Sequence, residues 1–212
     1  MKVYRKIRQG SDEWFAARAG RPTASKFGKI ITPKGKLSAQ SEEYLDYLIG
    51  ASFMPEREDF GGTRWTDRGN ELEPEAREAF QNLIGREVHE VGFVTRDDNV
   101  VGCSPDGLLK DANGEWEEGL EIKCKSPGVH AGIFRSGKLP DDVKVQVHGC
   151  LAVTGLPRWH FFSFLPGVNP FHLVVERDEF TDKVSAALDE FLIRYAEVRK
   201  QVIPKLQLPK SP

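Results

Sequence analysis

The sequence lacks the cysteine pattern of a disulfide-bonded or zinc-binding protein. Its 212 residues include three cysteines, Cys103, Cys124 and Cys150, which are widely spaced and never form a C-x-x-C pair. Each lies in an apolar stretch, where a cysteine usually serves as a small buried hydrophobic residue. A disulfide framework and a structural zinc site are therefore not expected.

Long apolar runs are also missing. No segment is apolar over the roughly 20 residues that a membrane-spanning helix needs. The first residues, Met1-Lys-Val-Tyr-Arg-Lys, lack the apolar stretch of a signal peptide. Hydrophobic residues nevertheless make up 39% of the chain, which is enough for a core. We expect a cytoplasmic globular protein without membrane contact.

Several catalytic and binding motifs are absent as well. The sequence has no Walker A motif and no H-E-x-x-H motif, and its five histidines have no metal-ligand spacing. The segment Asp111-Ala-Asn113-Gly-Glu115 begins like a calcium-binding loop, but Ile122 stands where that loop has its last glutamate. It is better interpreted as a turn.

The overall charge does not indicate a nucleic-acid-binding protein, but its distribution is uneven. The net charge is −2 and the pI is about 6.2. No acidic residue lies between Glu13 and Glu42, whereas six basic residues do: Arg18, Arg21, Lys26, Lys29, Lys34 and Lys36. Such a stretch can bind phosphates or can be an ordinary solvated face. Taken alone, the charge pattern favours the solvated face.

Periodicity and turn residues predict one α/β domain with a central mixed sheet flanked by helices. Residues 204–212 are expected to form an extended or disordered tail after a domain of residues 1–203. Helices are expected at residues 12–19, 24–31, 42–53, 67–84, 141–154 and 182–201, with Thr23 as the N-cap of the second. Strands are expected at residues 88–95, 100–109, 119–125, 158–165 and 172–176, the first three as a meander with a hairpin at Asn113-Gly114.

The most informative pattern is Ser104-Pro-Asp106-Gly, followed by Glu121-Ile-Lys123. Side chains alternate along a strand, so Glu121 and Lys123 share a face, and the hairpin folds their strand back toward Asp106. Two carboxylates suit a hard divalent cation, which lowers the pKa of a bound water and stabilises charge on a phosphodiester. A neighbouring lysine can orient or help deprotonate that water. By itself this short pattern often occurs by chance.

The pattern Pro105-Asp106…Glu121-Ile-Lys123 resembles the PD-(D/E)xK nuclease signature. More narrowly, the sequence is similar to the phage lambda exonuclease (YqaJ-type viral recombinase) family. The similarity occurs in five blocks in the same order, at residues 9–20 with 23–25, 69–77, 103–107, 120–124 and 145–150.

The resemblance assigns a role to each matching residue of the catalytic centre. It implies that Asp106, Glu121 and the main-chain carbonyl of Ile122 bind metal. The individual role of Glu73 rests on the resemblance alone: it would join the acidic cluster, through metal-bound water. Lys123 would position the attacking water, with Gln146 beside it. Read without the family, Gln146 is equally a surface amide.

The resemblance also implies a pocket for a 5′-terminal phosphate, formed by Arg18, Ser25 and Ser104. Guanidinium and hydroxyl groups suit this task because arginine makes forked hydrogen bonds to phosphate oxygens. Without the resemblance, Arg18 could be a helix-surface cation, Ser25 a residue of a helical first turn, and Ser104 a cap of the Pro105-Asp106-Gly107 turn.

The resemblance implies a Mg²⁺-dependent 5′→3′ exonuclease with a two-metal site in which Mn²⁺ can substitute. It would digest the 5′-ended strand of linear double-stranded DNA to mononucleotides and leave a 3′ overhang. The family further implies a homotrimeric ring and a single-strand annealing protein as partner in recombination. Two alternatives remain open: a PD-(D/E)xK endonuclease of restriction or repair type, and a catalytically silent DNA-end-binding module.

Overall fold

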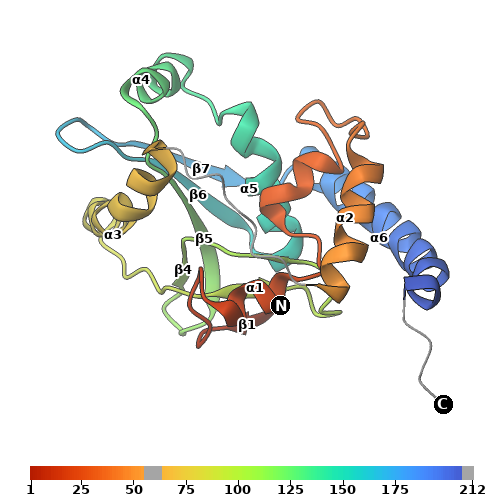
Figure 1. Ribbon diagram of the computed structural model, residues 1–212. Coiled ribbons are helices and arrows are strands. Elements are labelled where there is room, and N and C mark those ends of the chain that lie inside the picture. Colours follow the sequence, from red (N-terminus) through yellow and green to blue (C-terminus); the bar gives the residue numbers. More distant parts are fainter. Residues whose placement is uncertain (55–63, 207–212) are drawn as a thin grey trace.

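The computed structural model describes residues 1–54 and 64–206. Figure 1 shows strands at the centre of the molecule with helices on both sides. The elements in chain order are β1 (Lys2–Tyr4), α1 (Asp12–Arg18), the 3₁₀ helix η1 (Ala24–Lys29), α2 (Ser41–Phe53), α3 (Arg64–Ile84), β2 (Phe93–Thr95), β3 (Gly102–Cys103), β4 (Gly107–Lys110), β5 (Trp116–Lys123), α4 (Pro127–Ser136), α5 (Asp141–Thr154), β6 (Arg158–Ser163), β7 (Phe171–Glu176) and α6 (Glu179–Leu206).

The main sheet has the strand order β4-β5-β6-β7. The pairs β4–β5 and β6–β7 are antiparallel, whereas β5 and β6 are parallel and are joined by a crossover through α4 and α5. A parallel pair needs such a crossover, because a tight turn can only reverse the chain direction. The predicted α/β domain with a mixed central sheet is confirmed.

The predicted three-strand meander is wrong in one respect. The expected strand 100–109 is divided by Ser104-Pro105-Asp106 into β3 and β4, which belong to different sheets. Proline has no N–H group and a fixed φ angle, so it interrupts strand pairing. Strand β3 pairs with β2, and β1 adds to the other edge of β2 to form a small antiparallel sheet that the sequence did not predict.

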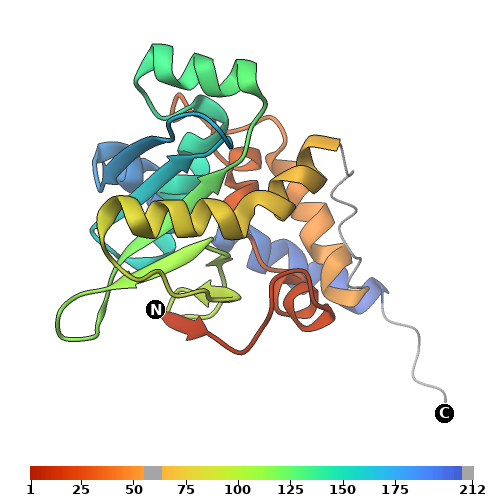
Figure 2. The same ribbon diagram turned by 90° about the vertical axis from the view of Figure 1, so that its left-hand side faces the viewer.

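The two faces of β5 are covered by different helices. Leu120 and Ile122 pack with Ala76 and Phe80 of α3 in one hydrophobic cluster. On the opposite face, Gly119 lies against the ring of Trp159, which belongs to a larger cluster with residues of η1, α2, α5 and α6. Figure 2 shows α3 lying across the near face of the sheet, and Figure 1 shows α5 on the other side. As expected from strand alternation, Glu121 therefore faces the α5 side.

Most helix ends follow the signals in the sequence. The Ser11 side chain accepts a hydrogen bond from the Trp14 N–H at the start of α1. Thr23 makes no such cap at η1, contrary to expectation. Gly155, with φ of +73°, ends α5, and α5 has the predicted bounds. Helix α6 extends from Glu179 to Leu206 and so includes the first three residues of the predicted tail. Residues 207–212 lie outside the described residues.

Helix α4 was not predicted. Its ten residues include two glycines, and Gly has a low helix propensity. Pro127 at its first position and Gly137 after its end, with φ of +61°, suit a helix start and stop. Among the described helices, none is long and apolar enough to cross a membrane.

Candidate active site

The predicted catalytic residues lie together where β4, β5 and α5 meet. Asp106 precedes β4, and its Oδ2 accepts a hydrogen bond of 2.6 Å from the main-chain N–H of Ile122. Glu121 is 1% exposed, and its Oε1 accepts hydrogen bonds from Lys123 Nζ and, at 2.6 Å, from Gln146 Nε2. The surface-amide interpretation of Gln146 is therefore wrong, because its amide points at the buried carboxylate.

Strand geometry also places the carbonyl of Ile122 on the Asp106 side. Within a strand, the N–H and C=O of one residue point to the same edge. Because the Ile122 N–H bonds to Asp106, its C=O points to that edge too. The Ile122 side chain packs on the α3 face and takes no part. Two carboxylates and one carbonyl thus converge from adjacent chain segments.

One oxygen of the cluster lacks a partner. Glu121 Oε2 is buried and has no hydrogen bond among the described residues. A buried carboxylate oxygen without a donor is costly unless a cation or a proton satisfies it. Within residues 1–54 and 64–206, no three side chains of Asp, Glu, His or Cys converge as a metal site. The two carboxylates and the Ile122 carbonyl are oxygen donors of the kind that hard divalent cations bind.

Glu73 approaches the cluster from α3. Its carboxylate pairs with Arg77, one turn further along the helix. Arg77 Nε also donates to the main-chain carbonyl of Asp106 at 3.0 Å, and its NH1 pairs with Glu90. Arg77 therefore joins α3 to the segment that carries Asp106, and it was not identified from the sequence.

The charges of the cluster act on one another. Burial and the charge of Glu121 raise the pKa of Asp106 well above its ordinary value. Burial raises the pKa of Glu73 too, with Glu90 and Glu121 adding to the effect against Arg77. Burial alone would lower the pKa of Lys123, but Glu121 and Asp106 raise it above its ordinary value. The two carboxylates thus favour the ammonium form of Lys123.

The predicted phosphate pocket is assembled next to this cluster. Arg18 NH1 donates to Ser104 Oγ at 3.1 Å, and NH2 donates to Thr23 Oγ1 at 3.2 Å and Ser25 Oγ at 3.4 Å. The guanidinium also lies over the Trp14 ring, 4.1 Å from its centroid. One cation and three hydroxyls from α1, η1 and the β3–β4 segment therefore converge, as a phosphate site requires.

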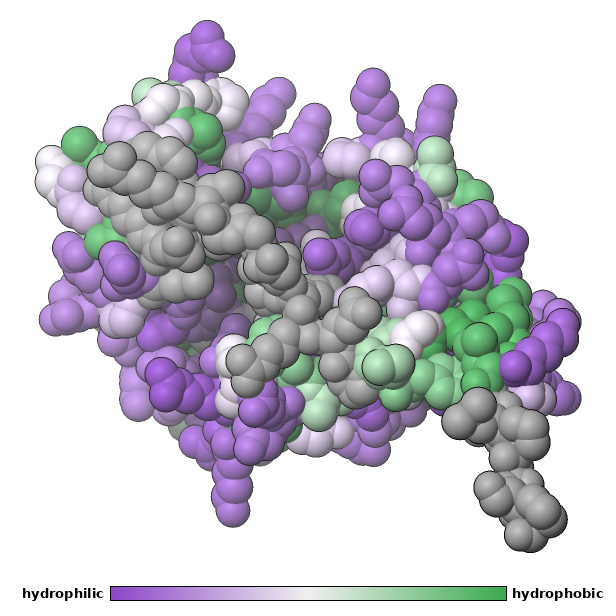
Figure 3. Space-filling model, in the orientation of Figure 1, coloured by the Kyte–Doolittle hydropathy of each residue, from purple (hydrophilic) through white to green (hydrophobic). Residues whose placement is uncertain are grey.

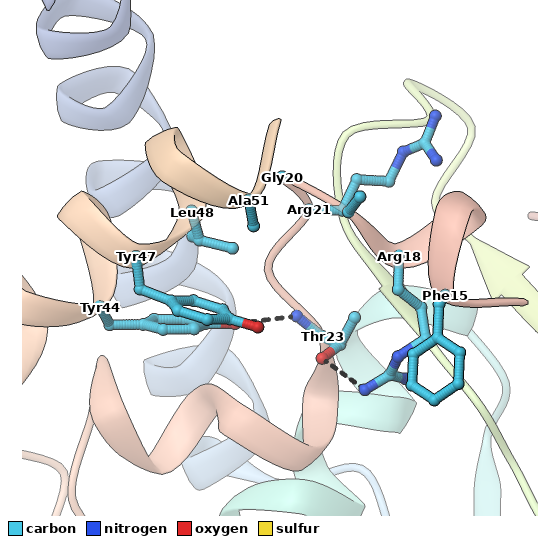
Figure 4. Close-up of a pocket in the computed structure, with 10 residues that line it drawn as sticks. Phe15, Arg18, Gly20, Arg21, Thr23, Tyr44, Tyr47, Leu48 and Ala51 are labelled. Carbon is cyan, nitrogen blue, oxygen red and sulfur yellow. Dashed lines mark hydrogen bonds between the residues drawn. The ribbon is translucent and has the colours of Figure 1, made fainter. Parts of the chain in front are cut away.

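A small pocket adjoins Arg18 on the side of α2. Figure 4 shows the Arg18 side chain directed at Thr23, with Tyr44 and Tyr47 on the opposite wall. The Thr23 N–H donates to the hydroxyl of Tyr44 at 3.3 Å. The two bonds of Thr23 thus fix the backbone that leads into η1.

Two features fix the position of the predicted phosphate pocket relative to the acidic cluster. Ser104 and Asp106 are separated by Pro105 alone, whose carbonyl accepts a hydrogen bond of 2.9 Å from Gln9 Nε2. In addition, η1 packs tightly on α5: a Cβ added at Gly149 would lie 2.5 Å from the Phe27 ring. Because Gly149 leaves this space, the helix that carries Gln146 and the element that carries Ser25 approach closely.

The family follows from comparison with known proteins. Residues 13–157, more than half of the chain, match the family model of the YqaJ-like viral recombinase domain. The chain belongs to this family. No protein with a curated description matches it significantly.

Solved structures agree with the YqaJ-like assignment. An alkaline exonuclease (LHK-Exo) from Laribacter hongkongensis superimposes with a TM-score of 0.73 at 28% identity, covering 92% of this chain and 99% of that chain. The structure of LHK-Exo in complex with dAMP gives a TM-score of 0.72 at the same identity and coverage. A phage related exonuclease from Haemophilus somnus 129PT gives 0.61 at 16% identity over 88% and 96%, which shows the fold alone. The expected PD-(D/E)xK fold is confirmed.

In this YqaJ-like domain, the predicted catalytic residues and the predicted phosphate-binding residues form two groups, which Ser104-Pro105-Asp106 joins. Three further residues belong to the same contacts: Trp14, Thr23 and Arg77. Trp14 and Arg77 each lie four positions along a helix from a predicted site residue, a spacing that places side chains on one face. The sequence alone therefore contained a signal for Trp14 and Arg77. It contained none for the bond from Arg18 to Thr23, because that bond depends on how the chain turns between α1 and η1.

Proposed function

We propose that this protein is a Mg²⁺-dependent exonuclease that digests the 5′-ended strand of linear double-stranded DNA in the 5′→3′ direction. It would release mononucleotides and leave a 3′ overhang. The observation that carries the proposal is the joining of two sites through Ser104-Pro105-Asp106. One is an acidic cluster suited to phosphodiester hydrolysis, and the other is an arginine–hydroxyl pocket suited to a terminal phosphate.

The related structures support a nuclease that acts on DNA. The relative with the higher identity is described as an alkaline exonuclease, and it has been crystallised with dAMP. This compound is a deoxynucleoside monophosphate, the class of product that an exonuclease releasing single nucleotides would form. The 28% identity over nearly the whole of both chains makes the same activity the leading proposal here.

The acidic cluster fits a divalent cation. Asp106, Glu121 and the Ile122 carbonyl would hold the ion, and Glu73 would contribute through coordinated water, with a second ion in the same cluster. The unpartnered Glu121 Oε2 supports this assignment, as does the buried Asp106 carboxyl, whose pKa burial and the charge of Glu121 raise. Such an ion, Mg²⁺ with Mn²⁺ as a substitute, supplies an activated water and stabilises negative charge on the phosphate.

The protein residues around the cluster would position the reactants. As an ammonium group, Lys123 can donate a hydrogen bond to the attacking water or to a phosphate oxygen and so orient it. Gln146 and Lys123 share Glu121 Oε1 and so hold this carboxylate in one orientation. A preorganised set of this kind lowers the barrier because little rearrangement is needed during the reaction.

Removing Mg²⁺ should alter the free energy of unfolding, because the charge of the buried Asp106 carboxyl is then uncompensated. Changing pH should alter it as well, because this carboxyl gains or loses its proton. A carboxyl whose pKa is higher in the folded state binds its proton more tightly when folded. Without divalent ions, the contribution of Asp106 and Glu73 to stability should therefore fall as pH rises from their ordinary values through their raised ones. Asp106→Asn should remove much of this loss, and Mg²⁺ at a hundred times its Kd should stabilise the wild type by about 2.7 kcal/mol.

Thermal unfolding between pH 4 and pH 7, with EDTA or Mg²⁺, checks this expectation. The matched control is Asp142→Asn on α5, a largely exposed carboxylate paired with Lys125. It should respond to Mg²⁺ as the wild type does. An unchanged Mg²⁺ response in Asp106→Asn would contradict the proposed metal site.

Arg18→Ala should weaken the preference for a 5′-phosphate without abolishing hydrolysis. The Arg18 guanidinium donates to all three hydroxyls of the pocket, so its loss removes a charged hydrogen-bonded contact. That contact corresponds to about a ten- to hundredfold change in selectivity. Digestion rates of 5′-phosphorylated and 5′-hydroxyl duplexes measure it. Arg194→Ala on α6, paired with Glu42, changes the charge equally and should leave the ratio unchanged. If Arg18→Ala kept the full preference of the wild type for a 5′-phosphate, this pocket would be ruled out as the phosphate site.

The family resemblance further supports a homotrimer and a single-strand annealing protein that receives the 3′ overhang. A ring around the duplex would retain its substrate through contacts to backbone phosphates that are independent of sequence. Helix α6 carries the exposed Ile193 and Leu206, and Figure 3 shows apolar surface over its C-terminal half. This surface is available to another copy of the chain or to a partner protein.

Digestion of linear duplex DNA and of a covalently closed circle, in parallel and with Mg²⁺, tests the class of activity. The proposal predicts loss of the linear DNA and an untouched circle, because the pocket for a terminal phosphate requires an end. A nicked or linearised circle would indicate an endonuclease on the same core. Binding of linear ends without any hydrolysis would indicate a catalytically silent end-binding module.

A further inference from the structure

Helix α4 is fixed directly beside the catalytic strand. It begins four positions after Lys123, the last residue of β5. Lys123 is in register with Ser163 on the neighbouring strand β6, about 4.8 Å away as in any sheet. His130 of α4 is buried and bonds through Nδ1 to Ser163 Oγ at 2.8 Å, and through Nε2 to the Asn169 carbonyl at 3.0 Å. One face of α4 is thereby anchored next to the Lys123 end of the sheet.

The same face of α4 also presents an aromatic ring partly to solvent, because Phe134 lies one turn after His130. Phe134 is 47% exposed, although its ring contacts His130 and Phe171 edge-on, with centroids 5.1 and 5.5 Å apart. The contacts with His130 and Phe171 therefore fix the orientation of the Phe134 ring, while part of the ring remains exposed to solvent. Ala131, one turn earlier, is exposed as well and is too small to obstruct access. Figure 1 shows α4 projecting from the sheet, and Figure 3 shows pale and apolar surface there among polar side chains.

The segment that carries this ring contains basic residues and no acidic ones. No acidic residue occurs between Lys123 and Pro140, whereas Arg135 and Lys138 are exposed next to Phe134 and just after the helix. The first acids beyond are Asp141 and Asp142, of which Asp142 pairs with Lys125. An exposed aromatic ring flanked by basic side chains on an acid-free segment matches the chemistry by which proteins hold unpaired nucleotides.

We propose that α4 binds single-stranded DNA beside the active site, with a base stacked on Phe134 and backbone phosphates near Arg135 and Lys138. The inference rests on the proposed nuclease function and specifies a subsite for its substrate. An unpaired base is the most free to stack on a side chain, since bases inside a duplex are already stacked on both faces. Either strand at the digestion front can supply such a base: the strand being cut or the strand that survives.

Binding of three 5′-phosphorylated duplexes in EDTA tests the subsite by fluorescence anisotropy: one blunt, one with a 3′ overhang and one with a 5′ overhang. Phe134→Leu keeps an apolar side chain against Phe171 and removes the stacking face. It should weaken binding of one overhang duplex about tenfold. Binding of the blunt duplex should not change. Loss confined to the 3′ overhang identifies the surviving strand, and loss confined to the 5′ overhang identifies the cut strand.

Further variants separate stacking from other effects. Phe134→Trp should retain overhang binding, and Val100→Ala, which alters an exposed apolar residue between β2 and β3, should change nothing. Arg135→Ala and Lys138→Ala should each reduce the slope of log K against log salt by about 0.7 for the overhang. Circular dichroism checks that each variant is folded.

Equal binding of every duplex by wild type and Phe134→Leu would overturn the proposal and leave a protein partner as the occupant of α4. An equal loss on blunt DNA would overturn it too. Failure of the proposed function is a separate result: the wild type would then digest no linear DNA in Mg²⁺, whatever the binding data show.

Discussion

Replacing Asp106, Glu121 or Lys123 by alanine is expected to abolish DNA digestion while leaving the protein folded. Asp106 and Glu121 supply the carboxylates for the cation, and Lys123 supplies the only side-chain positive charge bonded to Glu121 among the described residues. Loss of one preorganised charged group from such a site lowers the rate by at least about 10²–10³-fold. The initial rate of nucleotide release from linear duplex DNA at saturating Mg²⁺ measures the effect.

The control for this series should lie near the site without belonging to it. Asp142→Ala removes a carboxylate from α5, four positions before Gln146, and should turn over normally. Circular dichroism and thermal unfolding should show that the inactive variants keep their fold. Normal turnover by any one of the three would refute the assignment of the catalytic centre.

Glu118→Ala is expected to destabilise the protein by about 3 kcal/mol, because it breaks a buried charged network. Glu118 is 3% exposed, yet its carboxylate pairs with Arg86, Arg158 and His160. His160 in turn bonds through Nδ1 to His172 Nε2 at 2.8 Å. Removing Glu118 leaves two guanidinium groups and one imidazole without their common acceptor. The expected destabilisation is at the low end of the range for a broken buried ion pair, because both arginines are a third or more exposed.

Glu117→Ala is the matched control for Glu118. Its carboxylate pairs with the same two arginines, but it is 33% exposed. A pair of this kind contributes below about 1 kcal/mol. Urea unfolding at pH 7 should therefore show a large loss for Glu118→Ala and a small one for Glu117→Ala. Equal losses would mean that burial of Glu118 has no special role.

The same network should make stability depend on acid pH. Burial alone would raise the pKa of Glu118, but the bond from His160 and the nearby arginines lower it below its ordinary value. Its contribution is then present above the unfolded pKa and is lost as pH falls through the folded one. Burial also lowers the pKa of His160, against the opposing effect of Glu118, so a further loss begins as pH falls below about 6.5. Glu118→Ala should remove the loss of stability that accompanies protonation of Glu118.

The parts of the fold that the sequence predicted are those fixed by local patterns. Helix α5 begins and ends where predicted, because apolar periodicity and Gly155 mark it clearly. The Asn113-Gly114 turn and the alternation along β5 place Glu121 and Lys123 on one face. The site residues were placed by resemblance, and the structure confirms that they lie together.

The features that were missed depend on tertiary contacts. Helix α4 has a glycine-rich sequence, and its position is held by the bond of His130 to Ser163, thirty-three residues away. Strand β1 has three residues and gains its structure only by pairing with β2. The Glu118 network links residues from α3's end to β7, none of which forms a motif along the chain. Local sequence carries little information about such contacts.

The most direct test of the account uses one linear duplex with different labels on its two strands and a 5′-phosphate on only one of them. Incubation with Mg²⁺ should release labelled mononucleotides from the phosphorylated strand and leave its complement intact as a single strand. The Arg18 pocket and the Asp106–Glu121 cluster together require this result. Release from both strands at equal rates, or digestion that begins at 3′ ends, would contradict it.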